Sequence, residues 1–410
     1  MIRWKWIGVK GVCCGCWQSL QLSCRRCRVL FWSLTYNAHC DRYYALDTVM
    51  EPLFWFIDNY VRKFGPIFVG FLVSMMGVVI IIAYVVVVPY EVVRITWAEF
   101  VLYFALGHWL LVNTVFNYYM AFNTEPGYPP VGSLIKEAVG ICKHCIGAKP
   151  PRTHHCRICN RCILKMDHHC PWLNQCIGHY NHRYFFLTML YMWLACIYIV
   201  VGMWNTFLDH FLNETDPTAP WCRAMSSRLF YSYLLCQPRS DLESTGSSLS
   251  ASMPPFLLPE VAPSSPAAVS SASAAAVFRL GVGVVAQNCI LFEFFCAAAM
   301  VVGVGLLMCW HIRLISSGET SIEQHINKET RSKFRREGRP AFSNPYDFGW
   351  RENWRIFFGE APGAKGWSRV IRRILLPSNH RPFGDGLTWI TAFQYHAQRN
   401  ILAEDCSNNV

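Results

Sequence analysis

Cysteines and histidines are concentrated in one short segment of this chain. The 35 residues from Cys142 to Cys176 hold seven cysteines and five histidines, and several of the cysteines follow one another at C-x2-C spacing. A C-x2-C turn lets two thiolates bind one tetrahedral Zn2+, and more distant cysteine or histidine ligands complete such a site. The segment therefore predicts two closed structural zinc sites. Spacing alone leaves open which ligand belongs to which ion.

Dense cysteines are also typical of disulfide scaffolds in oxidising compartments. This segment is too short and polar to build an apolar core, so metal binding would supply a folding free energy of roughly 10 kcal/mol per site. The charge distribution described below places the segment in the cytosol, where thiols stay reduced. We therefore favour metal ligands over disulfides.

Two four-ligand sites do not use every cysteine and histidine of the segment. A spare cysteine at the end of the run Asp167-His168-His169-Cys170 is a candidate nucleophile, because a reactive thiolate needs a neighbouring base or cation. The alternative is a zinc module without catalytic activity, such as a ring-like or LIM-like adaptor fixed to a membrane. Such an adaptor would need the metal ligands but no spare cysteine.

Apolar runs flank the cysteine-rich segment on both sides and would hold it at the membrane surface. Of the 410 residues, 53% are apolar and 15% are charged, whereas about a quarter of the residues in a soluble chain are charged. Since about 20 residues cross a bilayer as a helix, we predict transmembrane helices at residues 67–90, 100–122, 184–208 and 290–312. The fold class is thus an α-helical polytopic membrane protein, with four transmembrane helices and a small zinc-stabilised cysteine-rich cytosolic domain (residues 123–183) between helices 2 and 3.

Three polar side chains fall within or near these spans. His108 and Asn113 lie inside the second span, and Glu293 lies close to one mouth of the fourth. An ionisable group in a membrane is a functional candidate by default, which leaves a small transporter as an alternative. We favour interhelical hydrogen bonds for the first two side chains and an interfacial position for Glu293.

The distribution of lysine and arginine predicts the orientation. Residues 1–66, 123–183 and 313–410 hold nine, eight and fifteen basic residues against four, three and ten acidic ones, while residues 91–99 and 209–276 are acidic on balance. The three basic segments, and with them both termini, belong in the cytosol. The net charge of +11 then reflects topology and attraction to the lipid bilayer, and we expect no nucleic acid partner.

The remaining segments carry weaker signals. The N-terminal extension (1–66) lacks the sustained apolar stretch and the cleavage site of a secretory signal peptide, so we expect the first span to be a retained anchor. A transit peptide, suggested by the basic, acid-poor start of the chain, is the alternative. Residues 51–64 predict an interfacial helix, and residues 240–276 predict disorder within a lumenal loop at 209–289. Candidate modification sites are Cys13, Cys14 and Cys16 for acylation and Asn213 for glycosylation.

From Cys142 to Phe185 the chain resembles the cysteine-rich domain of the DHHC protein S-acyltransferases, or palmitoyltransferases. The resemblance is carried by Lys149-Pro150-x-Arg152-x2-His155-Cys156, by Asp167-His168-His169-Cys170-Pro171-Trp172, and by Asn174, Cys176-Ile177-Gly178 and Asn181. Flanking runs resemble the family's Asp-Pro-Gly, Thr-Thr-x-Glu and PaCCT motifs, namely Glu125-Pro126-Gly127, Thr320-Ser321-Ile322-Glu323 and Asn344-Pro345-Tyr346-Asp347-Phe348-Gly349. The resemblance leaves out the first sixty residues and the loop after the third span.

The resemblance implies a role for each matching residue. One zinc is expected on Cys142, Cys145, His155 and Cys162, and the other on Cys156, Cys159, His169 and Cys176. That leaves Cys170 as nucleophile, His168 as the base that takes its proton, and Asp167 as the group that orients the imidazole. The chain departs from the family pattern at Glu125, Ser321, Leu173 and Gln175.

The resemblance also implies a ping-pong reaction. A long acyl group passes from acyl-CoA (palmitoyl-CoA) to Cys170, and from there to cytosolic cysteines of membrane-associated protein substrates. The CoA phosphates need cations at the membrane interface, and the candidates are Lys149 and Arg152, with His154 behind them; ordinary solvated charge is the alternative. The tail is most similar to the sixteenth-numbered vertebrate branch of the family, which predicts the endoplasmic reticulum as the location, with the Golgi as the alternative.

Overall fold

The structure is a computed structural model that describes residues 49, 60, 62–130, 132, 135, 137–211, 266–364 and 366–397; the side chains of residues 62 and 266–284 are not described. The chain divides into two units, Met1–Phe64 and Gly65–Val410, and the contacts below belong to the second. Several predictions lie wholly or largely outside the described residues: the interfacial helix at 51–64, the modification sites at Cys13, Cys14, Cys16 and Asn213, and most of the loop at 240–276.

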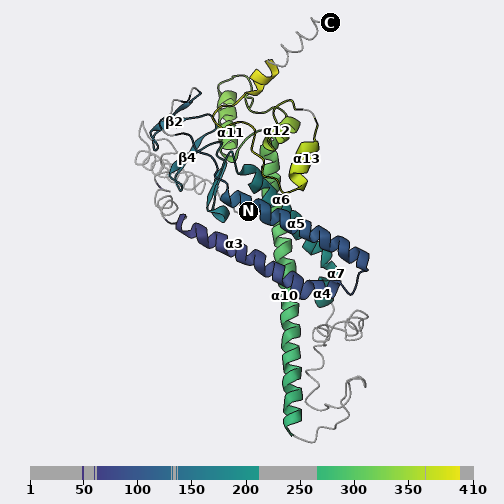
Figure 1. The fold of residues 1–410 in the computed structure, drawn as a ribbon. Helices are drawn as coiled ribbons and strands as arrows, with labels where there is room; N and C mark the ends of the chain where they lie inside the picture. The colour runs from purple at the N-terminus through teal and green to yellow at the C-terminus, as the bar shows by residue number, and fades with distance from the viewer. Residues whose placement is uncertain are drawn as a thin grey trace, which may run out of the picture. The chain divides into compact units, whose positions relative to one another are not determined.

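Four helices in the described part of the chain are long and apolar enough to cross a membrane, namely Lys63–Glu91, Trp97–Asn123, His182–Gly202 and Val285–Ser316. The first consists of α3 (Arg62–Ile82), the π-helical turn η2 (Ala83–Val87) and α4 (Val88–Glu91). The others are α5 (Trp97–Asn123), α6 (His182–Gly202) and the last part of α10 (Pro266–Ser316), all drawn in Figure 1. The predicted helical membrane fold with four spans is confirmed.

Local sequence explains where the first span widens and where the second span begins. Pro89 has no N–H to donate to the carbonyl four residues earlier, and the helix widens into the π-helical turn directly before α4. α5 begins with a capping box, in which the Thr96 hydroxyl accepts from the Glu99 N–H and the Glu99 carboxylate accepts from the Thr96 N–H. The two spans are therefore separated by a tight turn.

α6 packs against both α5 and α10, and the apolar core between them extends to the buried Cys170. His108 of α5 is hydrogen-bonded to the Tyr84 hydroxyl of the first span at 2.7 Å, which is the interhelical bond predicted for it. Asn113 differs from the prediction, because its side chain donates to the Trp109 carbonyl one turn earlier in its own helix. Such a local carbonyl is the nearest acceptor for an amide in an apolar bundle.

The segment between the third and fourth spans also differs from the prediction. α6 ends at Gly202, and a separate helix α7 (Trp204–Phe211) follows it. α10 begins at Pro266, so residues 266–289 are helical where a loop is predicted; its alanine-rich start has high helix propensity. Glu293 lies in the first third of the fourth apolar helix, Val285–Ser316, and its side chain is buried against neighbouring helices, being only 1% exposed.

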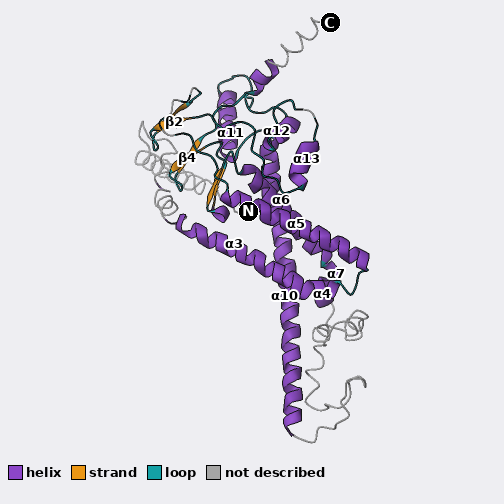
Figure 2. Ribbon diagram, viewed as in Figure 1, coloured by secondary structure: helices purple, strands orange, loops and turns teal. Residues whose placement is uncertain are grey.

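The segment between α5 and α6 forms three antiparallel hairpins, shown as orange arrows in Figure 2. The strand pairs are β1 (Gly140–Cys142) with β2 (Gly147–Lys149), β3 (His154–Cys156) with β4 (Arg161–Ile163), and β5 (His168–Cys170) with β6 (Gln175–Ile177). They begin at residues 140, 154 and 168, a constant spacing of 14 residues. In each turn one residue has a left-handed backbone, namely Ile146, Asn160 and Asn174. Hairpins this short do not fold independently. We call residues 140–177 the hairpin loop.

The tail after α10 gathers around the same end of the bundle as the hairpin loop (Figure 1). It contains α11 (Ser321–Arg336), α12 (Trp350–Phe357) and α13 (Ser368–Leu375). α10 ends in a Schellman motif at Gly318, whose φ is +63°. A side chain at this position would also come within 2.3 Å of the Tyr346 carbonyl oxygen, so glycine is required where the chain turns toward α11.

Candidate active site and metal centres

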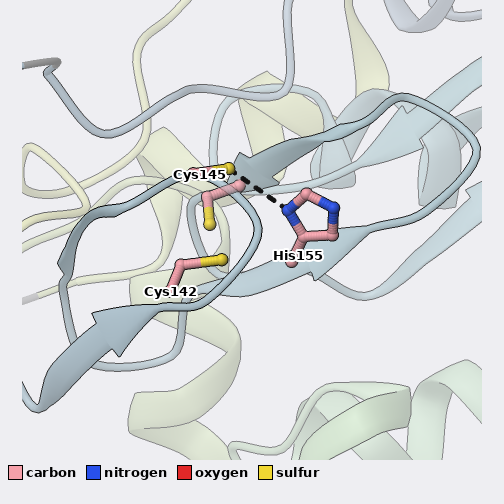
Figure 3. A group of neighbouring side chains, drawn as sticks. Cys142, Cys145 and His155 are labelled. Atoms are coloured by element: carbon pink, nitrogen blue, oxygen red, sulfur yellow. Dashed lines mark hydrogen bonds between the residues drawn. The ribbon is translucent and has the colours of Figure 1, made fainter.

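The first possible metal centre joins two hairpins. Cys142 and Cys145 come from the turn of the first hairpin, while His155 and Cys162 face each other across the second. One ligand atom from each lies within 4.8 Å of the others. Figure 3 shows the two first-hairpin thiols and the imidazole directed toward one another, with Cys145 Sγ 3.2 Å from His155 Nδ1.

The second centre repeats this arrangement one hairpin later. Cys156 and Cys159 come from the turn of the second hairpin, and His169 and Cys176 face each other across the third. His169 Nδ1 lies 3.8, 3.4 and 3.6 Å from the sulfurs of Cys156, Cys159 and Cys176, respectively. Each centre therefore combines the turn of one hairpin with a cross-strand pair of the next.

The donor atoms of both centres fit zinc. A tetrahedral Zn2+ with Zn–S near 2.3 Å and Zn–N near 2.0 Å holds its ligand atoms about 3.5 Å apart, close to the separations found here. Three thiols and one imidazole form a soft donor set that suits this ion. Four protein ligands leave no open position, which is typical of structural and not of catalytic zinc. The structure thus brings together the two ligand sets that the family resemblance implies.

Cys170 ends the first strand of the third hairpin, as Cys142 and Cys156 end those of the first two. In the first two hairpins a second cysteine follows three residues later, but in the third this place is taken by Leu173. The third turn therefore offers a single thiol. No group of possible metal ligands in the described part of the chain includes Cys170.

The third hairpin lies against the ends of the membrane helices. The Gln175 side-chain amide donates to the Ala121 and Phe122 carbonyls at the end of α5, and the Tyr118 hydroxyl donates to the Trp172 carbonyl. Cys170 is only 3% exposed and belongs to the apolar core of the helices. Its thiol thus lies where the polar loop meets the apolar bundle.

Strand alternation separates the two adjacent histidines of β5. Successive side chains of a strand point to opposite faces, so His169 faces the second metal centre while His168 shares a face with Cys170. His168 Nδ1 is 2.6 Å from Asp167 Oδ2, and its ring is also hydrogen-bonded to the Cys170 side chain. Burial alone would lower the pKa of His168, but the bonds to Asp167 and Cys170 raise this pKa to about 9. The arrangement favours an imidazolium beside a thiolate.

Asp167, which directly precedes β5, is fully buried against the first turn of α11. Its Oδ1 accepts from the Ser321 N–H at 2.7 Å and its Oδ2 from the Ser321 hydroxyl at 3.0 Å. Burial would raise the pKa of Asp167, but the adjacent His182 ring and the bond from His168 hold this pKa well below its usual range. The N-terminal dipole of α11 also favours a negative charge here. Asp167 is therefore held as a carboxylate that orients His168.

Arg152, a predicted contact of the CoA phosphates, is paired with an acidic side chain of the tail. Its Nε and Nη2 each lie 2.6 Å from a Glu323 carboxylate oxygen, and its Nη2 also donates to the Gly318 carbonyl. The Arg152 side chain is only 6% exposed. Its charge is thus neutralised, and Arg152 connects the hairpin loop to α11.

The other two predicted CoA contacts lie at the edge of the hairpin loop. Burial and the charge of Lys149 lower the pKa of His154, so this ring is neutral near pH 7 and is a poor partner for phosphate. Lys149 is half-buried and makes no ion pair within the described ranges. It therefore stays a candidate.

Three residues at the site were not assigned a role from the sequence. Ser321 was noted only as part of a motif, yet it supplies two of the three hydrogen bonds to Asp167. His182 and His311 lie at the ends of α6 and α10 and bring ring nitrogens close to the same carboxylate. They are far apart in the sequence, and no motif connects them.

This combination is typical of a membrane enzyme in which two possible metal centres stabilise a loop and a further cysteine is a candidate nucleophile. The DHHC palmitoyltransferase family model matches residues 135–328. Palmitoyltransferase ZDHHC16 of Homo sapiens is 37% identical over 372 residues, which cover 88% of this chain and 85% of that protein. ZDHHC16B of Danio rerio is 38% identical over 366 residues, covering 88% and 86%. Probable protein S-acyltransferase 16 of Arabidopsis thaliana is 26% identical over 300 residues, covering 69% and 78%.

The chain belongs to the DHHC palmitoyltransferase family. The predicted family and the predicted enzyme class, a protein S-palmitoyltransferase, are therefore confirmed, and the similarity to the sixteenth-numbered branch agrees with the relatives found. The alternatives of a zinc adaptor without activity and of a small transporter are set aside in favour of the enzyme.

Proposed function

We propose that the chain transfers a long acyl group from acyl-CoA to cysteines of other proteins, with Cys170 carrying the group between them. One observation supports this choice of nucleophile above others. Of the seven cysteines from Cys142 to Cys176, all of them described, six belong to the two metal centres and Cys170 does not. Cys170 is also the one that is hydrogen-bonded to His168.

In the first half-reaction His168 takes the thiol proton of Cys170, and Asp167 stabilises the resulting imidazolium. The thiolate attacks the thioester carbonyl, so a new C–S bond to Cys170 forms and the C–S bond to CoA breaks. The leaving CoA sulfur receives the proton from His168. Acid–base assistance of this kind typically contributes a factor of ~10²–10⁴ in rate.

The second half-reaction repeats these steps with a protein substrate. The substrate thiol gives its proton to His168 and attacks the acyl-Cys170 thioester, and Cys170 leaves as a thiol. A thioester is exchanged for a thioester, so the transfer is nearly balanced and needs no nucleotide. The nucleophile lies at the ends of the membrane helices, which suits an acyl chain that gains ~0.8 kcal/mol per buried methylene, or ~12 kcal/mol for sixteen carbons.

The two metal centres would hold structural Zn2+, which supplies the folding free energy that three short hairpins lack. Cys142, Cys145, His155 and Cys162 would hold one ion, and Cys156, Cys159, His169 and Cys176 the other. Lys149 is the remaining candidate of the predicted set for the CoA phosphates, because Arg152 is bonded to Glu323.

Replacing Cys170 with Ser tests the proposal. Purified full-length protein is incubated with palmitoyl-CoA, its intact mass is measured, and zinc is counted on the same sample. We expect wild type to gain one palmitoyl group and C170S to gain none, with two zincs in both. The control is C309S, which changes an exposed cysteine of α10 and should label like wild type. Labelling of C170S with its zinc intact would reject Cys170 as the nucleophile.

The substrates would be membrane-associated proteins with cytosolic cysteines, since the basic segments predict that the hairpin loop and both termini face the cytosol. The resemblance of the tail supports the endoplasmic reticulum over the Golgi. A protease-protection assay with tags at each end, combined with imaging against markers of both organelles, tests this. A protected tail or a lumenal loop would be incompatible with the mechanism.

A further inference from the structure

A third group of possible metal ligands lies beside the two zinc centres and contains no cysteine. Asp167, His182 and His311 each offer one atom, and these atoms lie within 4.8 Å of one another. The three side chains are 0%, 3% and 2% exposed. They come from three separate elements, namely the start of the third hairpin, the first residue of α6 and the last turns of α10. Only the folded bundle brings them together.

The two imidazoles are short of hydrogen-bond partners. Both ring nitrogens of His182 and Nδ1 of His311 are buried and have no hydrogen-bond partner within the described ranges. Buried polar atoms are paired in the great majority of cases, because an unpaired one has lost its solvation without compensation. A neutral imidazole keeps one ring-nitrogen lone pair, so His182 and His311 can each offer one nitrogen to a ligand next to the Asp167 carboxylate.

The carboxylate also has capacity left. An ionised Asp offers about four lone-pair sites, and Asp167 accepts three hydrogen bonds, two from Ser321 and one from His168. A fourth bond can therefore form without breaking the other three. Two imidazoles and one carboxylate with an open position are a donor set that suits Zn2+ and related divalent transition metals.

We propose that Asp167, His182 and His311 form a third, exchangeable Zn2+ site that inhibits the enzyme when it is filled. With three ligands and no thiolate, the site binds zinc more weakly than the two closed centres do. The bound cation draws the charge of Asp167 away from His168, and the imidazolium–thiolate pair with Cys170 is stabilised less. Zinc thus controls the acylation step through the residue that orients the base.

A cavity of about 140 Å³, lined mostly by residues of the tail, has one member of this group, His182, in its wall. Glu319, Arg152 and Lys165 line the same cavity. Arg152 is paired with Glu323 and Glu319 with Arg331, which leaves Lys165 as the group that opposes zinc uptake. The cavity offers a route by which a hydrated ion exchanges without unfolding the loop.

Zinc stoichiometry of the full-length protein tests the site without reference to activity. Protein in detergent is equilibrated with buffered Zn2+ at rising free concentration, and bound zinc is counted per chain. We expect wild type to bind two ions tightly and a third at higher concentration. His182→Phe and His311→Phe keep an aromatic ring but lose the ligand nitrogen, and each should stop at two. The matched control is His325→Ala, on the exposed face of α11, which should still bind three.

Two further measurements separate this site from others. Co2+ bound as the third ion should add no thiolate charge-transfer absorption, because its ligands are nitrogen and oxygen only. Filling the site should slow palmitoylation of Cys170 by a factor of ~10², and His311→Phe should abolish this inhibition. The inhibition assay depends on the proposed function, whereas the zinc count does not. Wild type that stays at two zincs at saturation overturns the proposal even if both Phe variants fail to fold.

Discussion

At the scale of single residues, each hairpin turn begins with a cysteine, and the residue three positions later determines whether that cysteine has a second thiol with which to bind metal. Cys156 is followed by Cys159, and both belong to the second metal centre. Cys170 occupies the equivalent place one hairpin later and is followed by Leu173, a buried apolar side chain that cannot coordinate. The thiol is therefore left to bond His168. The hairpins repeat the same pattern, and leucine in place of cysteine at position 173 leaves Cys170 available for catalysis instead of metal binding.

Replacing Leu173 with Cys should convert this turn into another metal-binding turn. The two thiols at C-x2-C spacing would bind an additional metal ion or form a disulfide, and Cys170 would be withdrawn from catalysis. We expect autoacylation to fall at least tenfold below that of L173S, the control for lost packing. Bound metal, free thiols and acyl incorporation are measured on one sample. Equal activities of L173C and L173S would contradict this account.

The two histidines of β5 should respond differently to substitution. H168A removes the base and should slow acylation by a factor of ~10²–10⁴, while both zincs stay bound because His168 faces away from them. H169A removes a metal ligand and should release one zinc and destabilise the loop. Single-turnover labelling and zinc counting distinguish the variants. Zinc loss in H168A would mean that the roles of the two rings are reversed.

At the scale of secondary-structure elements, the first turn of α11 connects the chemistry to the hairpin loop. Ser321 holds Asp167, and two residues later Glu323 both caps the helix and binds Arg152. Burial would raise the pKa of Glu323, but the adjacent Arg152 lowers it below the ordinary carboxyl value. Breaking a buried pair of this kind by removing one charge costs about 3–5 kcal/mol.

Glu323→Gln should therefore destabilise the protein in a pH-dependent manner. A carboxyl whose pKa is lowered by folding stabilises the folded state above its unfolded pKa, near 4.5, and loses this contribution as the pH falls through its folded pKa. The difference in thermal unfolding temperature between wild type and E323Q should be large at pH 7 and should shrink below pH 4.5. Both proteins share the same zinc ligands, so metal loss cancels. A difference that stays constant with pH would contradict the prediction.

At the scale of the whole molecule, the tail and the membrane helices stabilise one another around the site. The Asn353 side chain of α12 donates to the Ser316 carbonyl at the end of α10 and to Asp347, and accepts from the Phe348 N–H. At the end of α13, the Leu375 carbonyl accepts from the Trp109 indole of α5. The tail thus fixes the end of α10, from which the chain continues to Gly318 and α11.

Asn353→Ala should lower both stability and activity, although Asn353 touches no reacting group. The Ser316 carbonyl, the Phe348 N–H and Asp347 each lose a hydrogen bond. A fully buried unpaired group costs about 1–3 kcal/mol, and because these partners are partly buried or exposed, each loss should lie at the low end of that range. Thermal unfolding and palmitoylation are measured together. N123A, in which an exposed asparagine at the end of α5 loses a bond to its own helix, is the matched control and should change little. Wild-type stability of N353A would show that the tail does not support α10.

Much of this protein is determined by the sequence alone, because its strongest signals are local. Four apolar runs of sufficient length predict the membrane fold, and a polar segment with repeated C-x2-C spacing predicts metal. The run around Cys170 predicts a thiol nucleophile, and the family follows from motifs that need no geometry. Apolar runs define helix ends less well. α6 ends at Gly202, before its apolar run does, and α10 begins at Pro266, long before the apolar run of the fourth span.

Tertiary structure decides which polar groups meet across the fold. The sequence predicts Arg152 as a contact of the CoA phosphates, but α11 places Glu323 against it and pairs its charge within the protein. His182 and His311 carry no signal until α6 and α10 pack with their ends beside Asp167. Such contacts join residues that are distant along the chain, and their partners depend on helix packing. Periodicity and spacing encode which face of an element is buried, but not which charge lies opposite it.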